Sequence, residues 1–352
     1  MAFLKNTWYM AMWSKDLKPG EIIGRTLLNE QVVLFRAMNH QVSVLSDVCP
    51  HRFAPLHMGK LVDGCNLQCA YHGLVFDGSG ACVKNPHGSK KIPKTANVKK
   101  YAAVEKHSAI WIWMGNREAD PSTIPDFSML NEDSEHDVSR RDWIKMDASY
   151  ELVVDNLMDL SHTAFLHEGI LGNETTVDVI ANIEQLNGWI KVSRLATDAK
   201  IPGFFDLMFK RDGKNVDYWA DISWTQPACL KNDTGVTEPG APRSEGTGIF
   251  GMHFLTPETE STCWYHFAAV RQNPISWGEP IDSEIRDKIA DLRRYAFEQQ
   301  DQIIIRAQQQ TIQRSTIALR PVSLETDVGI ERYKRQLNQM IREEESEDKS
   351  SK

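Results

Sequence analysis

The sequence contains no run of about 18 apolar residues, the length at which a helix can begin to cross a membrane. Its first ten residues, MAFLKNTWYM, lack the long apolar segment of a secretion signal. It also lacks a basic excess, because 40 Lys and Arg residues stand against 48 Asp and Glu residues. Nucleic-acid binding needs a concentrated basic surface. We therefore expect a soluble, cytoplasmic protein whose partners include neither a membrane nor nucleic acid.

Cysteine is scarce, with six residues in a chain of 352. Disulfide frameworks are typical of small exported domains, and a chain of this length can bury a large core without them. Any paired cysteines are therefore interpreted as metal ligands rather than as bridges. The length also favours two domains over one.

Short β-type segments, separated by turn residues, dominate the first third of the chain. They predict a small antiparallel β domain over residues 1–120, and the Pro- and acid-rich stretch 116–126 is interpreted as a linker. The segments are QVVLFRA, QVSVLSD, LVFDGSGAC and SAIWIWMG.

The rest of the chain mixes helical and strand signals and predicts a second domain over residues 121–340. A helical segment is expected near residues 150–165, followed by strands that include GWIKVSRLA, VDYWADISW and CWYHFAAVR. Apolar residues recur at helical spacing over residues 282–314, which predicts a long amphipathic helix. The acidic tail, residues 341–352, is too polar to pack and is expected to be disordered.

Two short motifs each pair a cysteine with a histidine. CPHRF places Cys49 two residues before His51, and CAYHG places Cys69 three residues before His72. These four ligands could hold a structural zinc, but mixed zinc sites usually take two cysteines from one arm and two histidines from the other. One of each per arm suits a Rieske [2Fe-2S] cluster, in which two thiolates bind one iron and two imidazoles bind the other. Zinc remains the alternative.

Three neighbouring residues are not expected to be ligands. His57 lies between the two motifs, but its spacing fits neither, so it is interpreted as a residue at the surface or beside the ligands. Cys65 and Cys82 are expected to be small buried residues.

A second group of candidate ligands lies in DNLMDLSHTAFLHEG. Asn156, Asp159 and His162 follow one another at three-residue steps and would share one face of a helix. His167 is about 140° around a regular helix from His162, so both imidazoles reach one metal only if the helix ends or bulges between them, and Gly169 marks a possible end. With a remote carboxylate they would form the facial triad of non-haem Fe(II). A core histidine beside a surface histidine is the simpler alternative.

Together these motifs resemble the Rieske non-haem iron oxygenases, in particular oxygenase components of the vanillate O-demethylase and dicamba monooxygenase type. The resemblance runs from KNTWYMAMW through CPHRFAPLHMG, CAYHGLVFD and DNLMDLSHTAFLH to HFLTPETE and the late helix. It implies an α+β fold, with an N-terminal Rieske [2Fe-2S] β domain and a C-terminal helix-grip catalytic domain that has a curved antiparallel sheet. It also implies a ring-shaped homotrimer.

The resemblance implies two sets of iron ligands. The cluster ligands would be Cys49, Cys69, His51 and His72, and the ligands of a mononuclear Fe(II) would be His162, His167 and Asp301. Matching FEQQDQIIIRAQQQ to the late helix of the family selects Asp301, and Glu298, one turn earlier, is the alternative.

Two further residues gain roles from the resemblance. Asp159 would accept a hydrogen bond from the histidine equivalent to His72 in a neighbouring chain and would contact His162, which gives electrons a short path between subunits. Asn156 would lie near the iron without necessarily binding it. A solvent-exposed helical aspartate is the alternative for Asp159.

The implied activity is that of the terminal oxygenase of a multicomponent system. It would use O₂ and electrons from NAD(P)H, delivered by a flavin/iron-sulfur reductase or a ferredoxin, to hydroxylate a methyl or methoxy group of a small aromatic acid. O-demethylation with release of formaldehyde is favoured. The alternatives are methyl-group hydroxylation, ring dihydroxylation and a Rieske protein that only transfers electrons.

The resemblance also suggests how the substrate is bound. Asn232 and His253 occupy positions where an asparagine and a histidine of the family bind the carboxylate of an aromatic acid, and Lys231 adjoins the first. A turn asparagine and a buried strand histidine are the alternative.

A basic stretch follows the second Cys/His motif. Between Asp77 and Glu105 there is no acidic residue, but there are six lysines: Lys84, Lys90, Lys91, Lys94, Lys99 and Lys100. Our hypothesis is that this stretch helps to dock an acidic electron donor, since opposite charges speed such encounters. A solvated loop face is the alternative.

Overall fold

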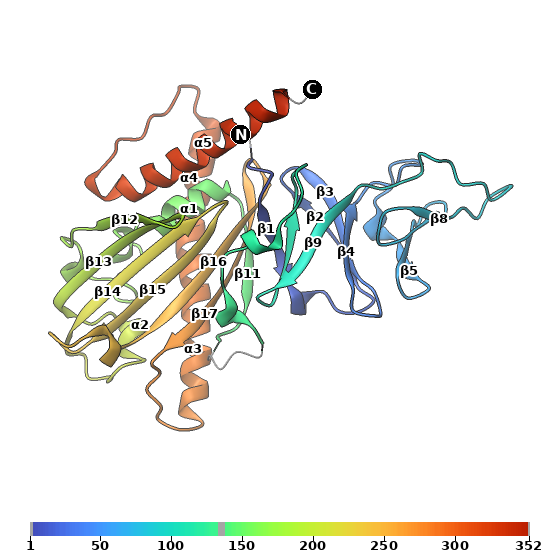
Figure 1. The fold of residues 1–352 in the computed structure, drawn as a ribbon. Coiled ribbons are helices and arrows are strands. Elements are labelled where there is room, and N and C mark those ends of the chain that lie inside the picture. Colours follow the sequence, from blue (N-terminus) through green and yellow to red (C-terminus); the bar gives the residue numbers. More distant parts are fainter. Residues whose placement is uncertain (1–2, 133–137, 351–352) are drawn as a thin grey trace. The chain divides into compact units, whose positions relative to one another are not determined.

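A computed structural model describes residues 3–132 and 138–350 and divides the chain into two compact units (Figure 1). The first unit comprises Phe3–Asp126 together with Thr256–Glu260, and the second comprises the rest of the described chain. The division therefore falls after Asp126, whereas the sequence placed the boundary after residue 120. No helix among the described residues is long and apolar enough to cross a membrane.

The first unit is built from two antiparallel sheets, as predicted. The six-stranded sheet has the order β1-β10-β9-β4-β3-β2, and the four-stranded sheet has the order β5-β6-β7-β8. Their strands are β1 Trp8–Trp13, β2 Ile22–Leu27, β3 Glu30–Arg36, β4 Val42–Ser46, β5 Lys60–Val62, β6 Asn66–Gln68, β7 Val75–Phe76, β8 Cys82–Lys84, β9 Lys100–Lys106 and β10 Ala109–Trp113.

The second unit is dominated by one seven-stranded antiparallel sheet with the order β11-β17-β16-β15-β14-β13-β12. Figure 1 shows that this sheet is strongly twisted and curved. Its strands are β11 Asp142–Met146, β12 Asn182–Leu186, β13 Trp189–Lys200, β14 Asn215–Thr225, β15 Cys229–Thr237, β16 Thr247–Thr259 and β17 Thr262–Gln272. The three strands predicted from the sequence are confirmed as parts of β13, β14 and β17.

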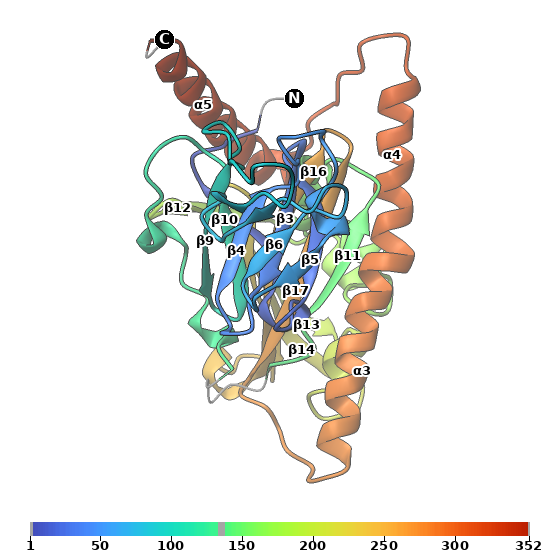
Figure 2. The ribbon, with the colours of Figure 1, turned by 90° about the vertical axis from the view of Figure 1, so that its right-hand side faces the viewer.

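Helices of the second unit pack against this sheet. They are α1 Tyr150–Met158, α2 Gly203–Asp206, α3 Ile281–Tyr295, α4 Gln302–Arg314 and α5 Val328–Ser350, with a π-helical segment η8 Ala296–Asp301 between α3 and α4. Figure 2 shows α3, η8 and α4 as one continuous column, which confirms the predicted long helix. Ile285, Ile289 and Arg293 are buried at four-residue steps, so one face of the column covers the core. The predicted α+β fold with a curved antiparallel sheet is thus confirmed.

Short 3₁₀ turns connect these elements. They are η1 Ser14–Asp16, η2 Leu56–Met58, η3 Pro121–Thr123, η4 Ser128–Leu130, η5 His162–Ala164, η6 Glu174–Thr176, η7 Arg243–Glu245 and η9 Glu325–Asp327.

The end of the chain differs from the prediction of a disordered tail. Helix α5 continues through Ser350, and it packs against α1 and β13. Tyr333, Leu337 and Ile341 are buried at four-residue steps, and Glu344 is buried three residues further on. The apolar residues before the acidic run therefore carry the helix into it, because helical spacing continues the packed face. Only residues 351 and 352 of the predicted tail lie outside the described residues.

Candidate iron centres and substrate pocket

The two Cys/His motifs fold into two loops with the same backbone hydrogen bonds. In each loop, the amide of the cysteine donates to the carbonyl five residues on, and the carbonyl of the cysteine accepts from the amide four residues on. The pairs are Cys49–Ala54 and Cys49–Phe53 in the first loop, and Cys69–Leu74 and Cys69–Gly73 in the second, all between 2.8 and 3.0 Å. The residue four positions after each cysteine has a positive φ: 59° at Phe53 and 71° at Gly73.

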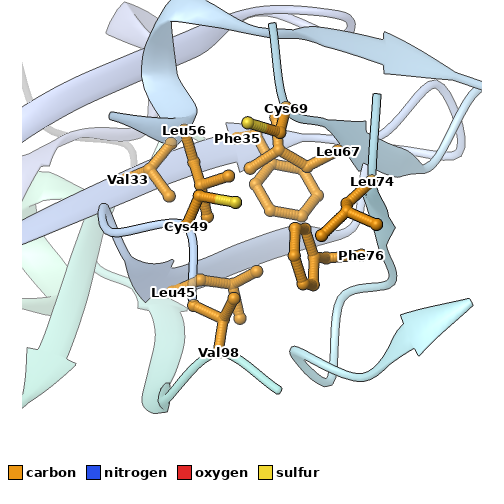
Figure 3. Packing of buried hydrophobic residues seen from close by; sticks show 10 residues of the cluster. All are labelled: Val33, Phe35, Leu45, Cys49, Leu56, Leu67, Cys69, Leu74, Phe76 and Val98. Carbon is orange, nitrogen blue, oxygen red and sulfur yellow. The ribbon is translucent and has the colours of Figure 1, made fainter. Parts of the chain in front are cut away.

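These loops bring the four predicted cluster ligands together. The thiols of Cys49 and Cys69 belong to a buried hydrophobic cluster, and neither forms a disulfide (Figure 3). The imidazoles of His51 and His72 lie nearer the surface, with ring centroids 4.4 Å apart. Burial and the neighbouring Cys69 thiol raise the pKa of Cys49, so a pair of thiolates here needs a balancing cation. Two buried sulfurs beside two imidazoles fit a [2Fe-2S] cluster of the Rieske kind.

The three nearby residues that were not expected to be ligands are His57, Cys65 and Cys82. The imidazole of His57 pairs with the buried carboxylate of Asp47, and its amide donates to the same carboxylate at 2.7 Å. Cys82 is half-buried, but Cys65 is exposed, so its predicted burial is wrong. Cys65 directly follows Gly64, which has a φ of 72°, and this turn connects β5 to β6. A residue at such a turn faces solvent.

The second motif brings two imidazoles to the late carboxylate. His162 Nε2 lies 3.6 Å from Asp301 Oδ1, and His167 Nε2 lies 3.1 Å from the same oxygen. One ligand atom from each residue falls within 4.8 Å of the others. Two ligands bound at about 2.1 Å and at a right angle lie about 3 Å apart. The three side chains therefore have the spacing of a facial triad, and two nitrogens with one carboxylate oxygen suit non-haem Fe(II).

The backbone between the two histidines is not a regular helix. Helix α1 ends at Met158, and His162 begins the 3₁₀ turn η5. The sequence predicted a helix that carries His162 and then ends or bulges before His167, so the observed end at Met158 is about one turn earlier than expected. Gly169, with a φ of 76°, follows the second histidine. The break allows two imidazoles spaced five residues apart to face the same carboxylate.

Each imidazole is fixed through the nitrogen that faces away from Asp301. His162 Nδ1 donates a proton to the main-chain oxygen of Asp159, and His167 Nδ1 donates to Gln300 Oε1 at 2.8 Å. Both acceptors are carbonyl oxygens, so each Nδ1 carries a proton, and Nε2 is the nitrogen of each ring that faces Asp301 and can bind a metal in place of a proton. Burial acts to lower the pKa of His167, but the hydrogen bond and charge of Asp301 outweigh it and raise the pKa.

The carboxylate comes from the π-helical segment. Asp301 is its last residue and is 4% exposed. Asn156 Nδ2 donates to Asp301 Oδ1 at 3.1 Å, which places Asn156 beside the triad as predicted from the family. The alternative carboxylate, Glu298, faces away: it forms an ion pair with Arg294 at 2.9 Å and is 36% exposed. π-Helical segments frequently occur at functional sites because the wider turn changes which residues share a face.

Helix α1 is held in place from both sides. Its N-cap, Ser149, accepts from the amide of Leu152, and the Ser149 amide donates to Gln309 of α4 at 2.9 Å. On the opposite side, Tyr333 and Lys334 of α5 both donate to the carboxylate of Asp155. Asn156, the next residue, is thus carried by a helix that is tied to two others.

The observed contacts of Asp159 lie within its own chain. Its side chain accepts from the amide of Ser161 at 2.7 Å and from the Ser161 hydroxyl at 2.5 Å, while its main-chain oxygen contacts His162. The carboxylate therefore holds the turn that follows α1, while the backbone amide of Asp159 donates to the oxygen of Asp155 at the helix end. Its predicted bridge to a neighbouring chain stays a prediction.

A pocket opens beside the triad, within the second unit. It contains about 930 Å³ of atom-free space, its open mouth included, and α1, the η5 region, the sheet and η8 supply its walls. Most of the wall is apolar and includes Leu157, Leu160, Phe204, Phe205, Ile249 and Phe297. His162, His167, Asp301 and Asn156 lie at this wall together with the predicted substrate residues Asn232 and His253. A cavity of this kind can hold a small aromatic ligand next to a metal.

The predicted substrate residues have different environments. His253 is 4% exposed, and burial together with the nearby charge of Arg293 lowers its pKa to about 3, so the imidazole is neutral. Asn232 lies one strand away on the same cavity wall. Lys231 faces the other side of the sheet, where its Nζ lies 4.8 Å from the centroid of the Phe250 ring. Strand alternation separates it from Asn232, so adjacency in sequence does not bring it to the pocket.

Two residues of the site were missed in the sequence. Gln300 directly precedes the predicted ligand Asp301, and its side chain braces His167. Arg293 lines the pocket and lies eight residues before Asp301, two steps of the same four-residue spacing. That spacing was the available signal for Arg293, whereas no signal pointed to Gln300, because a regular helix separates residues 300 and 301 by about 100°.

Comparison with known proteins agrees with this geometry. Residues 7–102 match the Rieske [2Fe-2S] domain, and residues 146–343 match the vanillate O-demethylase oxygenase C-terminal domain. The dicamba O-demethylase oxygenase component of Stenotrophomonas maltophilia is 34% identical, with 97% of this chain and 98% of that protein covered. The chloroacetanilide N-alkylformylase oxygenase component of Rhizorhabdus wittichii is 33% identical, with 97% of each chain covered.

A solved structure extends the likeness to the fold. The crystal structure of dicamba monooxygenase bound to 3,6-dichlorosalicylic acid superposes with a TM-score of 0.88 at 32% sequence identity, and covers 98% of this chain and 99% of that one. The chain therefore belongs to the Rieske non-haem iron oxygenases that carry a vanillate O-demethylase type C-terminal domain.

The family defines what kind of enzyme this is. The protein is the oxygenase component of a Rieske monooxygenase, with a [2Fe-2S] cluster and a mononuclear non-haem iron as cofactors. The relatives are named as oxygenase components or subunits, which implies a separate protein partner that supplies electrons. This membership favours an oxygenase over a zinc module and over a protein that only transfers electrons.

Proposed function

We propose that this oxygenase removes the methyl group of a methoxy-substituted aromatic acid. Hydroxylation of the methyl carbon consumes one O₂, two electrons and two protons and gives a hemiacetal and water. The hemiacetal then breaks its C–O bond to release formaldehyde and the phenol. The observation that carries the proposal is that the triad and the pair Asn232 and His253 line one cavity. Such a cavity can bind an acid group while a reactive carbon reaches the metal.

The proposed metal ligands follow the geometry described above. Cys49, Cys69, His51 and His72 would hold the cluster, and His162, His167 and Asp301 would hold the mononuclear iron. Bound there, Fe(II) would supply the activation of dioxygen. The chain itself orients both imidazoles through Asp159 O and Gln300, and it holds the carboxylate through Asn156. The apolar wall excludes water from the reacting carbon.

An aromatic acid is supported by the charges of the pocket. Arg293 is a buried guanidinium at the cavity wall, and among the described residues it forms no ion pair. Its Nη1 donates to Ser139 Oγ and its Nη2 to the oxygen of Ala268, both neutral acceptors. The charge of Asp142 acts on Arg293 only from a distance. A buried positive charge with no direct ion pair favours an anionic ligand. The relatives are named for different substrates, one for dicamba and another for chloroacetanilides. The substrate class proposed for this chain is therefore argued from its own pocket.

The proposed assembly is a homotrimer that works in the cytoplasm. Asp159 would connect the cluster histidine His72 of one chain to the iron site of the next. This proposal is supported by the position of His51 and His72 at the surface of their unit, where a partner can approach the cluster. Sedimentation equilibrium tests the trimer, and Asp159→Asn should slow electron transfer to the iron without removing either metal.

The proposed reaction is tested by turnover of a matched panel. Reduced, iron-loaded enzyme is mixed with O₂ and with methoxybenzoates or methylbenzoates, and formaldehyde, alcohol and diol products are measured. Formaldehyde equal to the phenol formed supports O-demethylation. An alcohol from the methylbenzoates, with no formaldehyde from the methoxybenzoates, would replace the proposal with methyl hydroxylation, and a cis-diol would replace it with dihydroxylation.

A further inference from the structure

The polar part of the sheet wall has a defined geometry. Asn232 of β15 pairs with Gly251 of β16, and His253 follows two residues later on the same face. Asn232 and His253 are therefore diagonal neighbours with Gly251 between them. A Cβ atom at Gly251 would lie 3.0 Å from His253 Nε2 and 3.3 Å from Asn232 Cβ. The glycine thus leaves a niche in front of both side chains.

The imidazole in this niche has a fixed tautomer. His253 Nδ1 lies 2.8 Å from the hydroxyl of Tyr265. Tyr265 is buried, and burial raises its pKa well above the ordinary value, so its hydroxyl keeps its proton. Among the described residues the hydroxyl has no other acceptor, and a buried O–H that donates to nothing is costly. Tyr265 therefore donates to Nδ1, and the proton of the neutral His253 lies on Nε2.

His253 Nε2 is the nitrogen at the niche. It is buried and has no hydrogen-bond partner among the described residues. Its N–H is therefore available to a ligand, and Gly251 keeps the approach open. An unsatisfied buried donor in a ligand pocket is expected where a ligand supplies the acceptor.

Asn232 is also oriented to offer a hydrogen-bond donor, through a contact within its own strand. Thr234 lies two residues on, on the same face, and its hydroxyl donates to Asn232 Oδ1. The amide oxygen is thereby occupied, which leaves the Nδ2 hydrogens as the group that Asn232 can offer to a ligand.

We infer that Tyr265 and Thr234 are positioning residues that make the niche at Gly251 a donor-only site, specific for an acceptor-only group such as a carboxylate or sulfonate. This inference rests on the proposed function and names the residues that set its preference for an acid group. Specificity of this kind is strong, because a ligand that brings its own donors leaves buried donors unpaired on both sides. Arg293 adds a positive charge to the same cavity.

The test uses three probes of nearly the same shape: benzoate, nitrobenzene and benzamidine. Benzoate is an anion with acceptors only, nitrobenzene is neutral with acceptors only, and benzamidine is a cation with donors only. Dissociation constants are measured by calorimetry on anaerobic, iron-loaded full-length protein. The expected order of affinity is benzoate, then nitrobenzene, with benzamidine weakest.

Variants of the positioning residues should change the ratio of affinities rather than overall binding. Tyr265→Phe and Thr234→Val should each weaken benzoate about 10-fold and strengthen benzamidine, because the imidazole or amide can then turn an acceptor to the niche. The matched control is Thr237→Val, on the same strand, whose hydroxyl donates to the oxygen of Pro242 at 3.4 Å. Cluster absorbance and iron content show that each variant is folded.

The possible outcomes separate the two proposals. If benzoate binds the wild type but the variants lower the affinity of all three probes equally, Tyr265 and Thr234 are only structural and the inference is overturned, while the aromatic-acid function stands. If the wild type binds benzamidine as tightly as benzoate, the aromatic-acid proposal itself fails. A rise in the benzamidine-to-benzoate ratio in both variants, absent from Thr237→Val, supports the inference.

Discussion

Gln300 Oε1 accepts from His167 Nδ1 at 2.8 Å, and Gln300 Nε2 donates to the main-chain oxygen of Leu166 at 2.8 Å. One amide thus holds both the ring of a predicted iron ligand and the backbone just before it. Because Asp301 is the next residue, the π-helical segment supplies a ligand and the brace of a second ligand from adjacent positions.

Replacing this brace should weaken iron binding. In Gln300→Leu the ring of His167 loses its acceptor, and loss of such partners typically costs 10–100-fold in metal affinity. Gln300→Glu keeps an acceptor and should retain most of the affinity. The control is Gln302→Leu, because Gln302 donates to the oxygen of Lys145 away from the triad. Fe(II) affinity is measured by competition with a chelator. Equal affinity in wild type and Gln300→Leu would contradict the role of Gln300.

The third ligand can be distinguished from its alternative by a pair of substitutions. Asp301→Asn removes a buried charge that faces both imidazoles, so the mononuclear iron should be lost while the cluster remains. Glu298→Gln breaks only a half-exposed pair with Arg294 and should leave both metals in place. Iron and acid-labile sulfide per chain are measured for both variants. Loss of iron from Glu298→Gln with retention in Asp301→Asn would reverse the assignment.

The basic stretch after the second Cys/His motif can be tested as a docking surface. All six lysines between Asp77 and Glu105 are exposed, and one of them, Lys99, pairs with Glu30 at 2.9 Å. Replacing Lys90, Lys91 and Lys94 with Glu should slow reduction of the cluster by an acidic donor about 10-fold at low salt, and added salt should reduce the difference.

The control for this surface is a second charge reversal of the same size. Lys15, Lys18 and Lys288 are exposed and lie outside the basic stretch, so their replacement with Glu changes the net charge equally. Stopped-flow reduction of the cluster measures both variants. An unchanged rate in the first variant, or the same slowing in both, removes the hypothesis of a specific docking surface.

A buried carboxylate away from the metal sites gives a pH-dependent stability. Burial acts to raise the pKa of Asp221, but hydrogen bonds from Arg243 and Lys191 outweigh it and lower the pKa below the ordinary value of about 3.9. A lowered pKa in the folded state stabilises the fold above pH 4, and this contribution is lost as the pH falls through the folded value.

Asp221→Asn should therefore reduce the free energy of unfolding by about 2 kcal/mol at pH 7, the size typical of hydrogen bonds to a charged group, because two half-exposed cations lose their partner. The difference between wild type and variant should shrink as the pH falls below 4. Urea unfolding curves at pH 7 and pH 3.5 measure it. A difference that stays constant over this range would show that the charge of Asp221 does not contribute.

Local patterns in the sequence predicted much of the architecture because they are set by local physics. Strand alternation and turn residues located β13, β14 and β17, and helical spacing located the column from α3 to α4. The Cys/His spacing works for the same reason, since each pair lies within one tight loop whose hydrogen bonds close over a few residues.

Features that depend on tertiary packing were harder to predict from the sequence. Asp301 and its brace depend on a π-helical segment that no residue type predicts. The early end of α1 coincides with the turn in which Ser161 donates to the carboxylate of Asp159. The tail was predicted to be disordered because it is highly charged. Its buried residue Ile341, however, continues the packed face of α5 that starts at Tyr333. Composition describes what a segment can do alone, whereas α5 is held by its contacts with other elements.

The central claim is that one chain carries a Rieske cluster and a separate mononuclear iron. The most direct measurement is the iron and acid-labile sulfide content of anaerobically purified, Fe(II)-loaded protein, together with the EPR spectrum after dithionite reduction. About three irons and two sulfides per chain, with a Rieske-type signal, are predicted from one [2Fe-2S] cluster and one further iron. Zinc without sulfide, or two irons with two sulfides after loading, would contradict the claim.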